Sequence, residues 1–194
     1  MDFKKHLLIG WDLTLSFIAP LILMTLVMGI VSFFSLGILA PVTMAGYMHS
    51  ILLMLREKRE PKVQDLFSQM RLFLPLLGFT VIVVIATLIG LVLLILPGII
   101  VSLAVAFSCL YLLPLMTDKK LGLIDAIKES FAMATKESVL DQVVTLILVV
   151  GISGIGGSLF IGWLFTQPLA ITFLLSVYEE KISYAPPTQA LTDK

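Results

Sequence analysis

Three long stretches of the chain contain no Asp, Glu, Lys or Arg: residues 13–55, 72–117 and 142–178, which hold 43, 46 and 37 residues. A straight helix of 43 residues would be about 65 Å long, whereas the hydrocarbon core of a bilayer is about 30 Å thick. Tilting does not absorb an excess of this size. Each stretch is therefore expected to turn and cross back, which predicts three helical hairpins, or six crossings.

The composition favours a membrane location for these helices. Apolar residues make up 59% of the 194 residues and charged residues 13%, against about 45–50% and about 25% in soluble domains. Because a chain this small cannot bury so much apolar surface away from water, we predict an all-α, polytopic integral membrane protein. Thirteen basic residues balance thirteen acidic ones, which argues against a nucleic-acid partner. The single cysteine, Cys109, excludes an internal disulfide and a thiolate metal cluster.

Residues that break helices mark where each stretch turns. They are Ser-Leu-Gly at 35–37, Leu-Pro-Gly at 96–98 and the glycine-rich residues 151–158. Proline suits a first helical turn, and glycine disfavours a helix interior. The predicted spans are about 13–34, 39–56, 73–95, 98–116, 141–156 and 159–178, within one domain of residues 1–180. We expect residues 181–194 to form a disordered cytoplasmic tail.

The positions of the basic residues predict the orientation. Every Lys and Arg lies before the first stretch, in the connections 56–71 and 119–136, or after residue 180. An even number of crossings places all of these segments on one side, and the positive-inside rule makes that side cytoplasmic. We therefore expect a multi-pass protein of the cytoplasmic (inner) membrane, with both termini in the cytoplasm.

Each of the two charged connections contains apolar residues at helical spacing. In the first these include Leu66 and Phe67, and in the second Ile127 and Phe131. The pattern predicts two short amphipathic helices at the cytoplasmic surface. They either join neighbouring spans or bind a partner protein or anionic lipid. The basic residues Arg56, Lys58 and Arg59 either anchor the topology or contact lipid headgroups.

Residues 37–140 resemble a known group of membrane proteins. The resemblance is carried by Ala-Pro-Val-Thr-Met-Ala-Gly-Tyr at 40–47, Leu-Pro-Gly-Ile at 96–99 and Asp-Ala-Ile-Lys-Glu-Ser at 125–130. This order is similar to that of bacterial and archaeal multi-helix membrane proteins of unknown function. It is also similar to the membrane region attached to some glycerophosphodiester phosphodiesterases. We expect no counterpart of their catalytic domain in these residues, so the resemblance implies a membrane architecture and no catalytic residue.

Two polar residues lie deep in the apolar stretches. His49 falls near the cytoplasmic end of the second span, and Gln167 precedes Pro168 in the last one. Each either packs between helices or contributes to a ligand site. His6 lies in the N-terminal segment, where we expect it to be flexible and without a role.

No enzyme motif is present in the sequence: it has no HExxH, no Ser-His-Asp set and no Gly-rich phosphate loop. We therefore expect a protein that is not an enzyme and that has no cofactor and no metal site. Its partners would be membrane lipids and a second copy or another protein. The favoured interpretation is an accessory or scaffold subunit that acts through helix packing and the cytoplasmic helices. The alternative is a lipid-handling or small-molecule transport protein with a path between helices.

Overall fold

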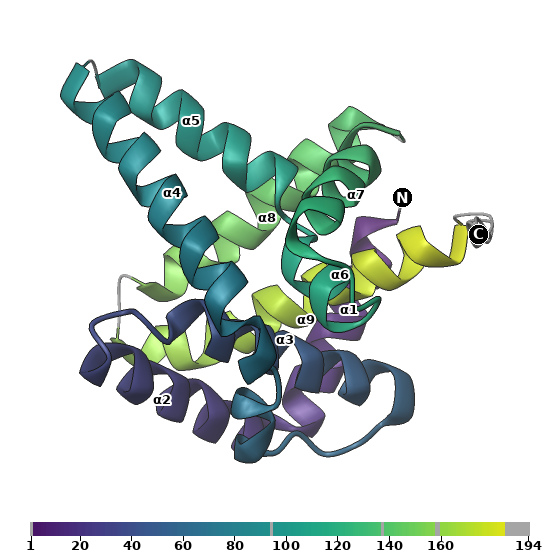
Figure 1. The fold of residues 1–194 in the computed structure, drawn as a ribbon. Helices are drawn as coiled ribbons and strands as arrows, with labels where there is room; N and C mark the ends of the chain where they lie inside the picture. Colours follow the sequence, from purple (N-terminus) through teal and green to yellow (C-terminus); the bar gives the residue numbers. More distant parts are fainter. Residues whose placement is uncertain (1, 94, 137, 158–159, 185–194) are drawn as a thin grey trace, which may run out of the picture.

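The computed structural model describes the backbone of residues 2–93, 95–136, 138–157 and 160–184. These residues form helices and no strand (Figure 1). The helices are α1 Phe3–Ser16, α2 Ile18–Phe34, α3 Ala40–Glu57, η1 Val63–Phe67, η2 Met70–Leu72, α4 Phe73–Leu93, α5 Ile95–Ser108, α6 Leu112–Thr117, α7 Leu123–Lys136, α8 Val139–Gly157 and α9 Phe160–Tyr184. The predicted all-α class is therefore confirmed.

Helices α3 and α9 form the centre of the molecule. α9 packs against α8, α1, α2 and α3, and α3 also contacts η1, α4 and α6 (Figure 1). Large side chains of both helices are fully buried, among them Tyr47 and Ile51 on α3 and Phe173 and Tyr178 on α9. The core therefore lies between one helix from the first half of the chain and the last helix.

The helices with the longest apolar runs lie at the periphery instead. α4 and α5 pack side by side and project away from the centre (Figure 1). Many of their large apolar side chains are exposed, as are those of α8. Among the described residues, the helical stretches 63–91 and 139–156 are long and apolar enough to cross a membrane. Helices α1 and α2, which meet at a bend, would add a third candidate span if together they crossed the membrane once.

Two of the predicted spans are interrupted. The span 13–34 is wrong as one helix, because α1 ends at Ser16 and α2 leaves it at 88°. The span 98–116 is divided where α5 ends at Ser108 and α6 begins at Leu112. A proline follows each break, Pro20 in α2 and Pro114 in α6. Proline lacks an N–H group and its ring clashes with the carbonyl four residues earlier, at positions 16 and 110.

Most of the other boundaries lie close to the predictions. The residues expected to form a turn at 96–98 instead belong to α5, which begins at Ile95, because proline fits the first turn of a helix. The turn expected at 35–37 is present, with left-handed backbone at Leu36 and Gly37. The glycine-rich residues 151–157, expected to disfavour a helix, nevertheless continue α8 to its end. A side chain at Gly156 would overlap the hydroxyl of Thr166 on α9, so glycine there allows the two helices to approach. The tail is also shorter than predicted, because Lys181 belongs to α9; residues 185–194 lie outside the described residues.

Candidate functional site

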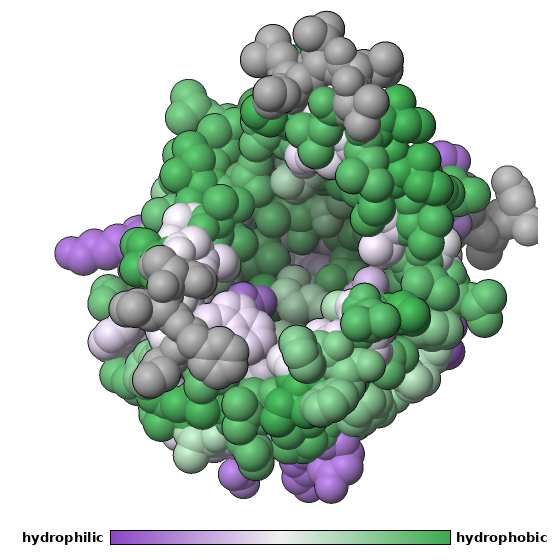
Figure 2. All heavy atoms as spheres, turned by 90° about the vertical axis from the view of Figure 1, so that its left-hand side faces the viewer, coloured by the Kyte–Doolittle hydropathy of each residue, from purple (hydrophilic) through white to green (hydrophobic). Residues whose placement is uncertain are grey.

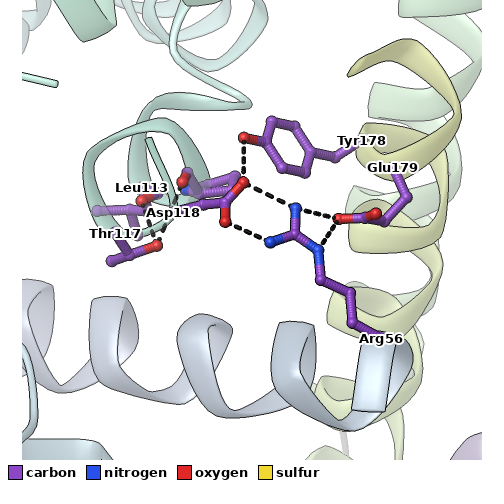
Figure 3. Close-up of polar contacts among 7 residues, drawn as sticks. Arg56, Leu113, Thr117, Asp118, Tyr178 and Glu179 are labelled. Atoms are coloured by element: carbon purple, nitrogen blue, oxygen red, sulfur yellow. Dashed lines mark hydrogen bonds and ion pairs between the residues drawn. The ribbon is translucent and has the colours of Figure 1, made fainter. Parts of the chain in front are cut away.

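Arg56 joins three helices at one end of the molecule. Its guanidinium lies between two carboxylates (Figure 3). It forms a bidentate ion pair with Asp118, which follows α6, with Nη2 2.8 Å from Oδ2. Nε donates a hydrogen bond to Glu179 Oε1 on α9 at 2.8 Å, and the Tyr178 hydroxyl donates to Asp118 Oδ2 at 3.2 Å. We call Arg56, Asp118, Tyr178 and Glu179 the Arg56 cluster.

The environment of Asp118 keeps its carboxyl ionised. Partial burial alone would raise its pKa, but the hydrogen bonds and positive charge of Arg56, with smaller effects of Tyr178 and His49, lower the pKa below its ordinary value. The ionised carboxylate is the form that accepts the two hydrogen bonds from the guanidinium. The Arg56 cluster therefore connects α3, α6 and α9 at neutral pH. Sequence reasoning placed Arg56 at the surface but gave no sign of these distant partners.

A second polar contact connects α1 to the same part of α9. His6 is 2% exposed, with Nδ1 2.8 Å from Ser176 Oγ and Nε2 2.8 Å from Glu180 Oε2. The expectation of a flexible His6 is therefore wrong. Lys181 is also buried and donates to the carbonyl oxygen of Met133 on α7 at 3.0 Å. The N-terminal helix, the end of α3, the second connection and the end of α9 thus meet in one region.

The first connection folds back along α3. The Asp65 carboxylate forms an ion pair with Arg59 and accepts a hydrogen bond from the Ser50 hydroxyl at 2.7 Å. A Cβ atom at Gly46 would lie 2.5 Å from the carbonyl oxygen of Asp65 and closer still to that of Leu66. Only a residue without a side chain admits the η1 backbone here. The segment predicted as an amphipathic surface helix is therefore two short 3-10 helices, the first held against the middle of α3.

Of the residues predicted as partner or lipid contacts, some are buried in the protein and others are exposed. Leu66 is 0% exposed inside the protein, so it offers no docking contact. Ile127 on α7 packs against the hydrophobic core. Phe67 and Phe131 are exposed. Lys58 is exposed as well and ends α3 in a left-handed conformation.

A largely apolar chamber lies between α3, α4, α5, α6, α8 and α9. It has a volume of about 430 Å³ and is lined by residues that include Met44, Phe79, Ala106, Ser153 and Gln167. None of the described residues that line it is charged. Figure 2 shows a hollow surrounded by hydrophobic side chains on the face that corresponds to the left of Figure 1. A volume in this range is typical of small-molecule sites.

The structure separates the two polar residues that the sequence singled out. Gln167 lines the chamber, where its amide nitrogen lies 3.9 Å from Met44 Sδ. Sulfur is a weak acceptor, so the amide keeps most of its hydrogen-bonding capacity. His49 is not among the residues that line the chamber. It is half-buried on α3, and its Nδ1 has no hydrogen-bond partner among the described residues.

These surroundings favour binding of an apolar group. An apolar wall gains free energy by covering apolar surface, and one amide fixes the position of a polar atom. In the part of the chain that the structure describes, no group of three or more His, Cys, Asp or Glu side chains is arranged to hold a metal ion.

Comparison of the chain with known proteins finds no matching family model, no similar curated protein and no similar solved structure. The resemblance of residues 37–140 to multi-helix membrane proteins therefore stays a prediction.

Proposed function

We propose that this chain is a multi-pass membrane protein that holds the acyl chain of a membrane lipid in the chamber beside Gln167. The observation that carries the proposal is the chamber itself, a hollow of about 430 Å³ whose described lining carries no charge and includes the amide of Gln167. Apolar side chains exposed on α4 and α8 favour a surrounding of lipid, since monomeric soluble proteins rarely expose large apolar patches. The occupant available in such a surrounding is lipid.

The proposed topology has six crossings, formed by α2, α3, α4, α5, α8 and α9, with both termini in the cytoplasm. It is supported by the meeting of the charged segments in one region, through the Arg56 cluster and the contacts of His6 with α9. Segments that meet in this way lie on one side of a membrane, and the basic residues favour the cytoplasmic side of the inner membrane.

The charge-free wall argues for a lipid chain in preference to an ion or a proton pathway. Intramembrane transport of ions or protons commonly uses ionisable residues, and the described lining of the chamber has none. Gln167 would donate a hydrogen bond to a polar atom of the bound lipid, such as an ester oxygen. His49, outside the chamber, has no role in this proposal.

The accessory or scaffold function has weaker support. It depended on four apolar residues of the cytoplasmic connections as docking contacts. Leu66 is buried and Ile127 packs against the core, which leaves Phe67 and Phe131 exposed. Those two side chains lie on different segments, η1 and α7. We therefore place lipid binding ahead of docking.

The proposal is tested by native mass spectrometry of protein extracted in mild detergent and loaded with a phosphatidylglycerol of known mass. We expect the wild-type chain to retain one lipid molecule. Ala106→Phe, which fills the chamber, should abolish the lipid adduct, and Gln167→Leu should weaken lipid binding about five- to tenfold by removing one hydrogen bond. Ala86→Phe and Gln64→Leu introduce the same changes at exposed positions and should retain the lipid as the wild type does.

Thermal unfolding of each variant shows whether it is folded. A folded Ala106→Phe variant that retains lipid like the wild type, or a wild type that retains none, would contradict the proposal. A stable oligomer without lipid would favour the scaffold function instead.

A further inference from the structure

Two further apolar hollows lie beside the chamber and share lining residues with it or with each other. The outer groove, of about 580 Å³, lies between α2 and Trp163 of α9. The middle hollow, of about 390 Å³, lies between the outer groove and the chamber. It shares Gly29, Ser32 and Trp163 with the outer groove, and it shares Pro41, Met44 and Leu113 with the chamber. The shared walls place the three spaces in one series.

The outer groove opens among exposed aromatic and aliphatic side chains. Phe33 and Phe34, which line it, are 77% and 80% exposed, and Leu36 beside them is 90% exposed. None of the described residues that line the groove or the middle hollow is charged. In a membrane protein such a mouth faces hydrocarbon, because exposing this surface to water is unfavourable. The occupant it fits is a lipid acyl chain.

Trp163 stands where the outer groove meets the middle hollow. A Cβ atom at Gly29 would lie 3.0 Å from Cζ3 of its indole ring, so the ring rests directly on the backbone of α2. Rotation or displacement of this ring changes the width of the passage. Further inward, Met44 stands at the wall common to the middle hollow and the chamber, in contact with Gln167. Methionine is flexible and adapts to different shapes.

We propose that a lipid acyl chain enters sideways from the bilayer, between α2 and α9, with Trp163 as the gate and Gln167 at the inner end. The path runs from the outer groove through the middle hollow and past Met44. Displacement of Met44 by the entering chain frees the Gln167 amide for the lipid. This inference rests on the proposed function of the chamber. It adds the route by which lipid enters and leaves. The route affects the rate of lipid exchange and not the amount of lipid bound at equilibrium.

The test measures how fast a bound lipid exchanges. Protein loaded with a phosphatidylglycerol that carries deuterated acyl chains is mixed with vesicles of unlabelled phosphatidylethanolamine and phosphatidylglycerol. Native mass spectra then follow replacement of the heavy lipid with time. We expect Trp163→Ala to speed exchange about tenfold and Gly29→Val, which narrows the passage, to slow it about tenfold. Each corresponds to about 1.4 kcal/mol in the barrier.

The matched control is Gly78→Val on α4, where an added side chain meets nothing within 4 Å; it should exchange like the wild type. If Gly29→Val does not fold, Trp163→Ala carries the test alone. Exchange at the wild-type rate in a folded Trp163→Ala variant overturns the gate and leaves the chamber in place. A wild type that never retains lipid overturns both the gate and the proposed function.

Discussion

Helix α3 is more polar than helix α4, and yet α3 is the more deeply buried of the two. α3 carries Tyr47, His49, Ser50 and Arg56, yet most of its residues are buried. α4 has no charged residue, yet most of its large apolar side chains are exposed. In water the apolar helix would be the one covered by the rest of the protein. The comparison therefore indicates that a helix of this fold is buried where its polar side chains form hydrogen bonds or ion pairs with other helices.

Three polar residues of α3 illustrate this dependence. The Tyr47 hydroxyl lies 2.9 Å from the hydroxyl of Thr25 on α2, and Ser50 donates to Asp65. Arg56 bonds to Asp118 and Glu179. In hydrocarbon an unpaired polar group costs several kcal/mol, which explains why Tyr47 and Ser50 face the protein interior. The side chains of α4 have no such requirement and are free to face lipid.

A large effect is expected at Gly46, where the first connection lies against α3. Gly46→Ala would bring a methyl group into backbone atoms of Asp65 and Leu66, and backbone cannot rotate away as a side chain can. We expect the free energy of unfolding to fall by about 3 kcal/mol, the upper part of the usual range for overpacking. Thermal or SDS-induced unfolding in detergent measures it.

Gly78→Ala on α4 makes the same substitution in open space. It should be neutral or stabilise by up to about 1 kcal/mol, because alanine favours the helix. Equal effects at the two glycines would show that η1 does not pack on α3, and the contrast between α3 and α4 would lose its main support.

The sequence predicted regular helices well where local signals mark both of their ends. The spans 39–56, 73–95 and 141–156 correspond to α3, α4 and α8 within a few residues, because charge-free stretches and turn residues are local signals. The breaks before Pro20 and Pro114 were not predicted. Each proline was nevertheless a usable signal, because its ring disfavours a helical carbonyl four residues earlier.

The partners of the functional residues were not predictable in the same way. Arg56 and Glu179 are separated by 123 positions, and His6 and Ser176 by 170. The periodicity of a helix, about 3.6 residues per turn, gives no information about contacts between such distant positions. The chamber beside Gln167 likewise combines residues of six helices, so the sequence indicated a polar residue at depth, Gln167, but not the space next to it.

A smaller effect is expected at the Arg56 cluster, which fixes the polar end of α3. Arg56→Met would leave the carboxylates of Asp118 and Glu179 unpaired. Its side chain is 34% exposed, so we expect a loss of about 1–2 kcal/mol, less than the about 3–5 kcal/mol of fully buried pairs. The dependence of this loss on pH identifies the ion pair.

The pKa of Asp118 is lower in the folded protein than its ordinary value. Its contribution to stability is therefore fully present above the ordinary aspartate pKa of about 3.9 and is lost as the pH falls through the lowered value. The wild type should lose stability in acid, and Asp118→Asn should lose less over the same range. Parallel acid profiles, measured by thermal unfolding against pH, would mean that Asp118 does not hold Arg56.

The smallest effect is expected on the exposed face of α4. Ile85 is 52% exposed. In a membrane the side chain of Ile85 contacts lipid whether the protein is folded or unfolded, so Ile85→Ala removes no contact that is gained on folding. Without transfer from water to protein there is little free energy to lose, so the change in stability in bilayer nanodiscs should stay within about 0.5 kcal/mol. Ile51→Ala on α3, at a fully buried position, should cost about 2–5 kcal/mol. A loss at Ile85 as large as that at Ile51 would mean that another protein surface covers α4, and the outer face of this helix would then be an interface and not a boundary with lipid.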